Sequence, residues 1–381
     1  MTMFDAIPKE HWPREVVFFI PELNASGAQM VLVNLANGLA RTGMVVEIVV
    51  CRSDGPLVKE LDPVIKLVDL QAGYLLAIPR LIRYLRRRRP AALVAFYNAF
   101  TILPIFAKWL AHSSVRIVPT LHTMVTNVQT ESPIRLLRFG YRVMTRVWKS
   151  MPRVVAVSQM VAEDLARYGI PLEHITVIYN PVLDPAFERK SLQSFDWHNW
   201  PTDTTPVIVG VGRLCHQKNF GALVRAFAIL RNRLPAKLVI VGEGDERQTL
   251  VKLTNELGIA GDVFFTGFVE NPVPYMKRAS VLALTSRYEG LGNVAVEALA
   301  VGTPVVSYDT LPVREIIAPP GWISLVPPGD GALFADALLA AIQTGRPRHA
   351  IDMALLQEQF GVSGVVHQYG TLLAEVSSGA H

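Results

Sequence analysis

Short runs of consecutive apolar residues alternate with amphipathic stretches along most of the chain. Such runs are typical of parallel strands buried on both faces, and apolar residues recurring every three or four positions between them are typical of helices. The first half predicts strands at 16–20, 45–50, 65–70, 92–96, 115–121, 154–157 and 175–178. The second half predicts strands at 207–211, 237–241, 263–266, 281–285, 304–307 and 323–326. Because strands and helices alternate, we expect doubly wound α/β domains with right-handed crossovers.

The alternation stops at residues 184–205, which mix prolines and polar residues with Trp197 and Trp200, two side chains that we expect to be exposed. This stretch predicts a linker between two Rossmann-like domains, residues 1–183 and 206–361. In open parallel sheets, ligands bind at the carboxyl ends of the strands. The loops that follow the predicted strands are therefore the places to look for chemistry.

Composition excludes several classes of protein. Half of the 381 residues are hydrophobic and 18% are charged, which is enough apolar material for two cores and argues against disorder. Cys51 and Cys215 are too few for a disulfide framework and lack metal-ligand spacing. Residues 1–14 lack a signal-peptide pattern, and the most apolar region, 98–121, is interrupted by charged residues before it reaches membrane-spanning length. We therefore expect a reduced, cytoplasmic protein.

Positive charge is concentrated in the first half of the chain, where the residues through Pro185 include 21 Lys and Arg against 14 Asp and Glu. Part of the excess lies at 80–89 and part at 135–149, where basic residues recur at three- and four-residue spacing between apolar ones. A basic amphipathic helix of this kind can bind an anionic membrane surface. A solvated basic face above an ordinary core face explains the pattern equally well.

The stretch at 285–307, TSRYEGLGNVAVEALAVGTPVVS, combines the end of a predicted strand, a glycine turn and a helix expected over 293–301. Free backbone N–H groups and the helix dipole favour an anion at such a helix start, so phosphate is the natural ligand. Glu289 in the turn and Glu297 inside the helix would suit hydroxyl groups on either side of a phosphate. A nucleotide-sugar has both features, although a strand–loop–helix unit with two surface glutamates is also common in ordinary α/β structure.

Two cations, Arg213 and Lys218, follow the predicted strand at 207–211 in the sequence GRLCHQKNF, which opens the next helix. A guanidinium and an ammonium group at a helix start can neutralise the charge that builds on a diphosphate leaving group, as a metal ion would. Simple solvation of two cations near a helix start is the alternative explanation.

Several other enzyme classes lack their motifs. No Asp-x-Asp triplet, P-loop, His-Glu-x-x-His or Gly-x-Ser-x-Gly occurs in the sequence. The GEG turn that follows the strand at 237–241 resembles part of a dinucleotide fingerprint, but Arg247 stands where the third glycine would be. We therefore expect neither a metal-dependent glycosyltransferase with a single Rossmann domain nor a dehydrogenase.

The stretch at 285–307 is similar to the Glu-x7-Glu signature of the retaining glycosyltransferases of family 4, E-G-L-x-N-x-x-x-E-A-x-A-x-G-x-P-V-V, with Glu289 and Glu297 at its acidic positions. The sequence around Arg213 resembles the G-R-x-x-x-x-K motif of the same family. The resemblance is strong from 210 to 306 and looser before that. It implies the GT-B fold, in which two Rossmann-like domains face each other across a cleft and a C-terminal helix, here about residues 362–381, crosses back to the first domain.

The resemblance also implies roles for individual residues. The residues expected to be catalytic are His122, Arg213, Lys218 and Glu289. The residues expected to bind the donor are Gly27, Gly212, Gly242, Glu243, Gly244, Phe268, Val269, Gly290, Leu291, Gly292, Asn293, Val294 and Glu297. The family's G-G-A-E turn is replaced by S-G-A-Q at 26–29, which leaves the contact made by that turn open. Ser158 and Asn180 match family positions near the hinge, where helix capping is the alternative role.

The resemblance implies a retaining hexosyltransferase, with a UDP-sugar favoured over a GDP-sugar as the donor. Neither a metal ion nor a cofactor is expected, and the nucleotide-sugar is a co-substrate. The expected acceptor is a lipid-linked or growing oligosaccharide of bacterial polysaccharide or glycan biosynthesis, on the inner face of the cell membrane. An anionic membrane surface is a further expected partner, and nucleic acid is not. Two alternatives stay open: a soluble glycosyltransferase for a small acceptor, and a catalytically silent GT-B protein that only binds a nucleotide-sugar.

Overall fold

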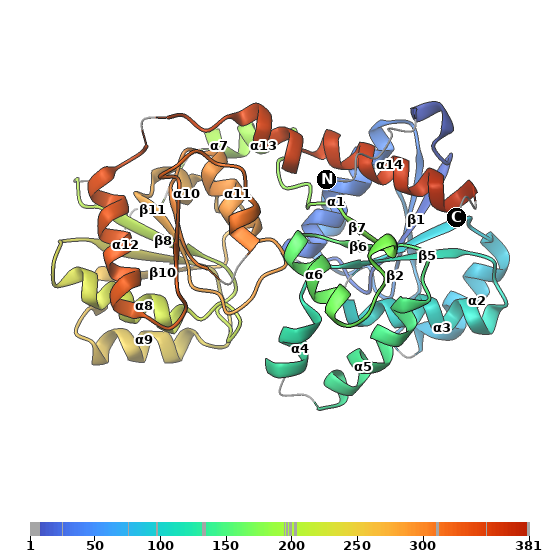
Figure 1. Ribbon diagram of the computed structural model, residues 1–381, viewed down its shortest axis with the longest axis horizontal. Coiled ribbons are helices and arrows are strands. Elements are labelled where there is room, and N and C mark those ends of the chain that lie inside the picture. The colour runs from blue at the N-terminus through green and yellow to red at the C-terminus, as the bar shows by residue number, and fades with distance from the viewer. Residues whose placement is uncertain are drawn as a thin grey trace. The chain divides into compact units, whose positions relative to one another are not determined.

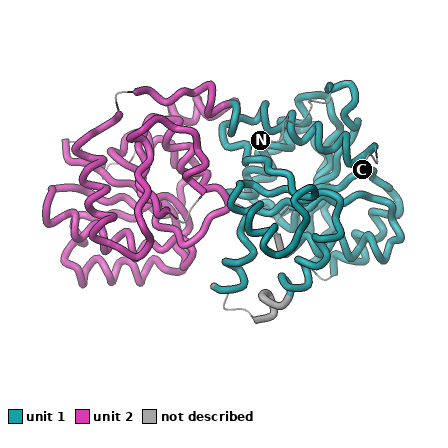
Figure 2. Tube along the Cα trace, in the orientation of Figure 1, with its two compact units in different colours: residues 1–184, 358–381 teal, residues 185–357 magenta. Residues whose placement is uncertain are grey.

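The computed structural model describes residues 8–24, 26–74, 76–96, 98–131, 135–193, 195, 197, 200–201, 204–309, 312–347 and 349–378. The chain divides into two compact units, coloured separately in Figure 2: unit 1 is Met1–Asp184 with Glu358–His381, and unit 2 is Pro185–Gln357. Each unit is built on one parallel sheet. This confirms the prediction of two Rossmann-like α/β domains.

Unit 1 contains a seven-stranded parallel sheet in the order β3-β2-β1-β4-β5-β6-β7. Its strands are β1 (Glu15–Phe19), β2 (Val45–Val50), β3 (Lys66–Asp69), β4 (Ala92–Ala95), β5 (Arg116–Leu121), β6 (Val154–Ala156) and β7 (Ile175–Val177). The central strands are buried along almost their whole length. Their sequences are continuous apolar runs because helices cover both faces of the sheet.

The helices of unit 1 are α1 (Gly27–Arg41), α2 (Ala77–Arg88), α3 (Ile102–Ala111), α4 (Val125–Glu131), α5 (Arg135–Lys149), α6 (Gln159–Arg167) and α14 (Val362–Ser378). Figure 1 shows α1 and α14 on one face of the sheet and α2 and α3 on the other. Successive residues of β1 point to opposite faces, so Phe18 packs with α1 and α14 while Phe19 packs with α2 and α3. α5 joins a separate core with Leu121 and Val154.

The end of the chain packs on unit 1. A Cβ atom on Gly38 of α1 would lie 2.6 Å from the side chains of Val362 and Val366, so this glycine allows α14 to approach α1 closely. The C-terminal helix expected over about 362–381 is α14, which follows α13 (Met353–Phe360) with Gly361 between them. The two helices are separated there because Gly361 pairs with Leu183 in a parallel bridge.

Unit 2 contains a six-stranded parallel sheet in the order β10-β9-β8-β11-β12-β13. Its strands are β8 (Val207–Val211), β9 (Lys237–Val241), β10 (Val263–Gly267), β11 (Val281–Leu284), β12 (Val305–Tyr308) and β13 (Ile323–Val326). Its helices are α7 (Phe187–Leu192), α8 (Phe220–Arg231), α9 (Arg247–Glu256), α10 (Val273–Arg278), α11 (Asn293–Ala300) and α12 (Gly331–Thr344). α8 and α12 pack on one another over the core, with Phe227 and Phe334 fully buried.

In each unit, every strand predicted from the hydrophobic pattern is present, with ends shifted by no more than one residue. No helix in the described ranges is both long and apolar enough to cross a membrane.

The described part of the predicted linker is partly helical and packs its aromatic side chains on unit 2. Its described residues include α7, and Trp197 and Trp200 are half-buried rather than exposed. The ring centroids of Trp197 and Phe264 are 5.8 Å apart, and those of Trp200 and Tyr275 are 6.3 Å apart. The expectation of exposed tryptophans was wrong because large aromatic side chains gain from burial, and unit 2 supplies aromatic partners for them.

Candidate functional site

Two loops meet where the strand order of unit 2 reverses. β8 and β11 are neighbours in the sheet, and the chain continues from them in opposite directions, to β9 and to β12. In an open parallel sheet, ligands bind at this reversal, outside the carboxyl ends of the strands. The sequence containing Arg213 and Lys218 follows β8, and the sequence containing Glu289 follows β11. The fold therefore brings the two predicted motifs to one edge of the sheet.

An ion pair joins these motifs. Lys218 Nζ lies 2.5 Å from Glu289 Oε1, and Ser286 Oγ donates to the same oxygen at 2.7 Å. Only 20% of the Lys218 side chain and 11% of the Glu289 side chain are exposed. Thr285 Oγ1 adds a hydrogen bond of 3.1 Å to the Asn219 carbonyl oxygen. Because desolvation offsets the attraction in a buried pair, its main effect is to fix the positions of Lys218 and Glu289 at this edge.

Glycines let the loops of this edge approach one another. A Cβ atom on Gly242 would lie 1.9 Å from the Gly212 carbonyl oxygen, and one on Gly244 would lie 2.3 Å from the Leu214 carbonyl oxygen. The Leu214 N–H also donates to the Glu243 carbonyl oxygen at 2.9 Å. The turn after β9 therefore packs directly against the motif after β8. It needs glycine because two backbones touch there.

The motif after β11 continues into the start of α11. The residues assigned to the donor here are the buried Gly290, Leu291 and Gly292 and the half-buried Asn293, Val294 and Glu297. Gly292 is the N-cap residue and has a left-handed conformation with φ +85°, which favours glycine. The positive end of the helix dipole and the N–H groups of the first turn thus follow directly on the loop that holds Glu289.

Other predicted site residues, including Arg213, which is expected to be catalytic, lie outside this ion pair. Arg213 is exposed directly after β8. Phe268 is 65% exposed and Val269 is half-buried, and both follow β10, which β9 separates from β8. The Glu243 carboxylate pairs with Arg247 at 2.9 Å on the surface. The described contacts do not join these side chains to the pair formed by Lys218 and Glu289.

A cavity of about 300 Å³ lies between α8 and α9 in unit 2. Its lining includes His216, Asn219 and Arg287 but neither Lys218 nor Glu289. The cavity is therefore a neighbour of the candidate site rather than the site itself. Among the described residues, no group of three or more His, Cys, Asp and Glu side chains is placed to hold a metal ion.

His122 lies at the carboxyl end of β5 in unit 1. Its ring packs on Phe96, which follows β4, with ring centroids 5.1 Å apart. The side chain keeps some exposed area, but burial of the imidazole lowers the pKa of His122 to about 4. The imidazole is therefore neutral near pH 7. It lies on a different unit from Arg213, Lys218 and Glu289.

The turn at the start of α1 follows β1, and Gly27 is the first residue of the helix. Gln29 is buried, and its side-chain N–H donates to the Glu22 carbonyl oxygen at 3.1 Å. Ser26 Oγ and Gln29 Oε1 are both buried and have no hydrogen-bond partner among the described residues, which do not include Ala25. Buried polar atoms are normally paired, so these two atoms are candidates for contact with a ligand.

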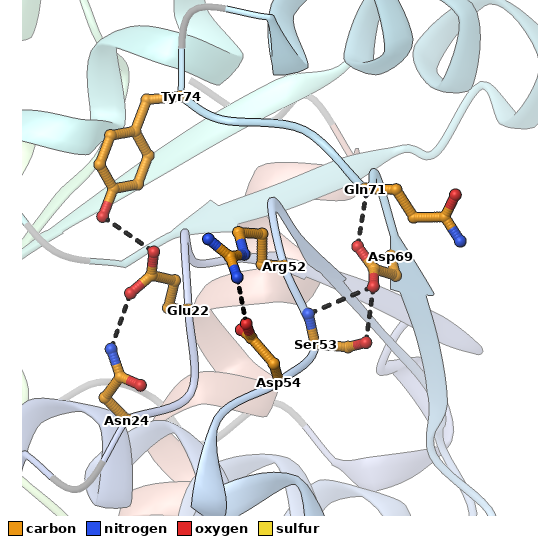
Figure 3. A network of polar contacts seen from close by, with 8 residues as sticks. All are labelled: Glu22, Asn24, Arg52, Ser53, Asp54, Asp69, Gln71 and Tyr74. Atoms are coloured by element: carbon orange, nitrogen blue, oxygen red, sulfur yellow. Dashed lines mark hydrogen bonds and ion pairs between the residues drawn. The ribbon is translucent and has the colours of Figure 1, made fainter.

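A polar network that the sequence analysis missed lies at the carboxyl ends of β1, β2 and β3 (Figure 3). It contains Glu22, Asn24, Arg52, Ser53, Asp54, Asp69, Gln71 and Tyr74. Asp69 accepts hydrogen bonds of 2.6 Å from the Ser53 hydroxyl and 2.6 Å from the Gln71 N–H. Burial raises the pKa of Asp69, but these bonds and the nearby Arg52 outweigh burial and leave that pKa below its usual value.

The same network borders an open cavity of about 460 Å³, lined by Arg52, Ser53, Asp54, Asp69, Gln71, Ala72 and Gly73. Glu22, beside it, accepts hydrogen bonds from Asn24 at 2.7 Å and from the Tyr74 hydroxyl at 3.1 Å. The sequence places polar residues at or near the ends of the predicted strands at 45–50 and 65–70, but only the strand order brings them together.

The two residues near the predicted hinge are both buried. Ser158 caps α6, where its Oγ accepts a hydrogen bond of 3.2 Å from the Val161 N–H. This contact supports the capping alternative for Ser158. Asn180 is 6% exposed and follows β7.

Two family models match the chain. The model described as Glycosyltransferase Family 4 matches residues 25–183, and the model described as Glycosyl transferases group 1 matches residues 195–354. Together they cover most of both Rossmann-like units. The chain therefore belongs to the group 1 glycosyltransferases, as its motifs predict.

Individual relatives match different shares of the chain. It is 25% identical to the N-acetyl-alpha-D-glucosaminyl L-malate synthase of Bacillus anthracis, over 72% of each protein. It is 34% identical to the N-acetylgalactosamine-N,N'-diacetylbacillosaminyl-diphospho-undecaprenol 4-alpha-N-acetylgalactosaminyltransferase of Campylobacter jejuni, over 39% of this chain and 38% of the relative. Several other curated relatives are matched over less than half of their own length.

Among solved structures, HepE of Anabaena in complex with UDP-glucose has a TM-score of 0.76 and 20% identity to this chain. The match covers 96% of this chain and 99% of HepE. At this level of identity the similarity shows a shared fold.

Proposed function

We propose that this protein is a retaining glycosyltransferase that moves a hexose from a UDP-sugar to a glycan acceptor in bacterial polysaccharide or lipopolysaccharide biosynthesis. The observation that carries the proposal is the ion pair between Lys218 and Glu289 at the strand-order reversal of unit 2, next to the start of α11. This arrangement combines cations and helix N–H groups for a diphosphate with carboxylates for hydroxyl groups. The complex of HepE with UDP-glucose supports a uridine nucleotide.

In the proposed donor complex, the diphosphate lies at the positive end of α11, and Arg213 and Lys218 neutralise its charge. Glu297, one helical turn further on, binds the ribose hydroxyls, and Glu289 binds the transferred sugar. The acceptor oxygen attacks the anomeric carbon on the face that the diphosphate leaves, and the departing diphosphate takes the acceptor proton. The anomeric configuration is thereby retained, and no metal ion is required.

His122 has a distinct part in this proposal. Its imidazole is neutral at the pH of the cell because burial lowers the pKa of His122 to about 4. A neutral imidazole makes hydrogen bonds to sugar hydroxyls without adding a positive charge. We assign it to the transferred sugar.

We assign the acceptor to the carboxyl edge of the unit 1 sheet. Carboxylates of Asp54 and Asp69 border the open cavity there, and Glu22 lies beside it. Carboxylates are good acceptors for sugar hydroxyls. A relative whose name includes diphospho-undecaprenol supports a lipid-linked acceptor, and the exposed cations of α5, Arg142, Arg146 and Lys149, suit peripheral binding to the inner face of the membrane.

The proposal is tested with a panel of UDP- and GDP-sugars in the presence of EDTA, measuring thermal stabilisation and donor hydrolysis. We expect a UDP-sugar to stabilise the protein most, because binding to the native state alone raises its stability. Lys218→Ala should abolish most of the hydrolysis, while Lys252→Ala, which removes an exposed lysine of α9, should not. If no nucleotide-sugar stabilises the wild type or is hydrolysed, the proposal is wrong.

Two further results would contradict parts of it. Strict dependence of activity on magnesium or manganese would exclude the metal-free mechanism. A β-linked product from an α-linked donor, detected by NMR of the glycan, would exclude retention.

A further inference from the structure

An exposed apolar stripe runs along α3 in unit 1. Ile102, Phe106 and Trp109 are 38%, 44% and 70% exposed, and their spacing of four and three residues places them on one side of the helix. The rings of Phe106 and Trp109 have centroids 6.0 Å apart. The opposite side of α3 belongs to the core through Leu103 and Ala107. The stripe is therefore fixed on a packed helix and presents its large side chains to solvent.

Basic helices lie at both ends of this stripe. At the C-terminal end of α3, Arg86 of α2 donates from Nη2 to the Leu110 carbonyl oxygen at 3.0 Å. At the N-terminal end, Trp148 of α5 donates from Nε1 to Thr101 Oγ1 at 3.2 Å. Figure 1 shows α2, α3 and α5 along one side of unit 1. The sequences of these three helices contain Arg and Lys but no Asp or Glu.

Several cations on α2 and α5 are available to a ligand. The exposed ones that pair with no acidic side chain in the described part of the chain include Arg83, Arg87, Arg142, Arg146 and Lys149. By contrast, Arg88 pairs with Glu15 at 3.0 Å and with Glu47 at 3.1 Å. The side chains of Arg135 and Arg138 lie outside the described part. The described exposed charges that α2 and α5 present beside the α3 stripe are therefore all positive.

We propose that α2, α3 and α5 form a membrane-binding face. Phe106 and Trp109 enter the boundary between the headgroups and acyl chains of an anionic bilayer, and the arginines bind its headgroups. Apolar side chains at that depth with cations above them are how surface helices bind membranes. This inference rests on the proposed function: membrane binding holds the enzyme at the surface that carries a lipid-linked acceptor. The basic run at 135–149 supplies only charge, whereas α3 supplies the apolar contact.

The charge pattern favours a bilayer over a second copy of this chain. In a two-fold symmetric dimer formed through the α3 stripe, the membrane-binding face of one copy would contact the same face of the other copy. Arginines would then oppose arginines, and α2, α3 and α5 have no acidic residue to compensate them. A surface of anionic lipid supplies the opposite charge across the whole face.

The test is flotation of the full chain with vesicles of phosphatidylglycerol and phosphatidylcholine, and with vesicles of phosphatidylcholine alone. We expect the wild type to float only with the anionic vesicles and to be released as salt is raised, because screening shortens the range of the charges. Phe106→Ser with Trp109→Ser should weaken partitioning about tenfold or more, since the apolar contact is lost. The matched control is Val251→Ser with Leu333→Ser, which removes two exposed apolar side chains of unit 2 and should have no effect.

The insertion of Trp109 into the bilayer is tested separately with brominated lipids, which quench tryptophan fluorescence on contact. Trp109→Phe keeps an apolar ring, so binding should persist while part of the quenching disappears. Quenching equal to that of the wild type would show that Trp109 does not enter the bilayer and would overturn the proposal.

Three other results would overturn it: no flotation of the wild type at low salt, unchanged flotation of the Phe106 and Trp109 double variant, or a wild-type dimer in sedimentation that this variant converts to monomer. The last result would show that a second copy covers the stripe. Donor hydrolysis in solution tests the proposed function independently. We expect the same rate in the wild type and in every α3 variant, because none of the residues assigned to the donor or to the transferred sugar lies on α3.

Discussion

The carboxyl edges of the two sheets share a strand order but carry different side chains. The order β3-β2-β1-β4 in unit 1 corresponds to β10-β9-β8-β11 in unit 2. In unit 2, the loops at this edge hold Lys218 against Glu289 beside a helix start. In unit 1, they place Asp54 and Asp69 around an open cavity. In the proposed function, one topology would thus serve a diphosphate at one edge and sugar hydroxyls at the other, because the fold fixes where loops gather while the loop residues decide what they bind.

The largest expected effect is on kcat, and it distinguishes a residue that stabilises charge in the transition state from one that only binds the donor at the unit 2 edge. Arg213→Ala should lower kcat by roughly 10²–10³-fold with a smaller change in the donor KM, because the guanidinium acts on charge that develops as the diphosphate leaves. Glu297→Ala should instead raise mainly the donor KM, because ribose binding is equal in ground and transition states.

Steady-state kinetics with varied donor measures both changes. Arg233→Ala, which removes an exposed arginine paired with Asp336, is the control. A raised donor KM with intact kcat in Arg213→Ala would refute the role given to that residue.

A second prediction compares glycines at the two edges. Gly242→Ala should destabilise the protein by about 3 kcal/mol, because its Cβ would overlap the Gly212 carbonyl oxygen and its φ of +146° is strained for alanine. Gly73→Ala, at the unit 1 cavity, should have little effect, because no atom lies within 4 Å of its Cβ position. Thermal or urea unfolding measures both, and equal stability of the two variants would contradict the close contact between loops in unit 2.

A third prediction concerns pH. The pKa of His122 is about 4 in the native state, against a usual value of 6.5. Between these values the unfolded chain binds more protons, so stability falls as the pH drops through this window, by about 3 kcal/mol at most. His122→Phe should remove that part of the pH dependence, whereas His112→Asn, at an exposed left-handed position, should keep it. The free energy of unfolding is measured with denaturant at pH 7 and pH 4.5. If His122→Phe showed the same pH dependence of stability as the wild type, a buried neutral imidazole would be excluded.

The smallest expected effect tests the unit 1 edge. Asp69→Asn keeps the shape of the side chain but removes its charge, so the acceptor KM should rise about tenfold while the donor KM stays the same. The control is Glu173→Gln, which neutralises an exposed carboxylate elsewhere in unit 1. Kinetics with varied acceptor measures the effect. A changed donor KM in Asp69→Asn would contradict the separation of the two edges.

The motifs of the unit 2 site could be predicted from the sequence because their signals are local. The runs that became β8 and β11 were visible as apolar segments, and the motifs after them carried Lys218 and Glu289 in fixed spacing. The network around Asp69 was missed because its members follow three different strands. Their proximity depends on the order β3-β2-β1, which no local pattern encodes. The half-buried state of Trp197 and Trp200 was missed for a similar reason, since their aromatic partners lie far along the chain.

The sequence by itself determined the strands, the two domains and the family, because burial of a strand on both faces leaves a continuous apolar run and a glycine turn at a helix start leaves a recognisable spacing. Only the tertiary structure decided which side chains meet. The pairing of Lys218 with Glu289, the cavity beside Asp69 and the exposed stripe of α3 between two basic helices all depend on elements that pack across long separations in sequence. These contacts follow from strand order and helix packing, and each is a property of the folded chain rather than of any one segment.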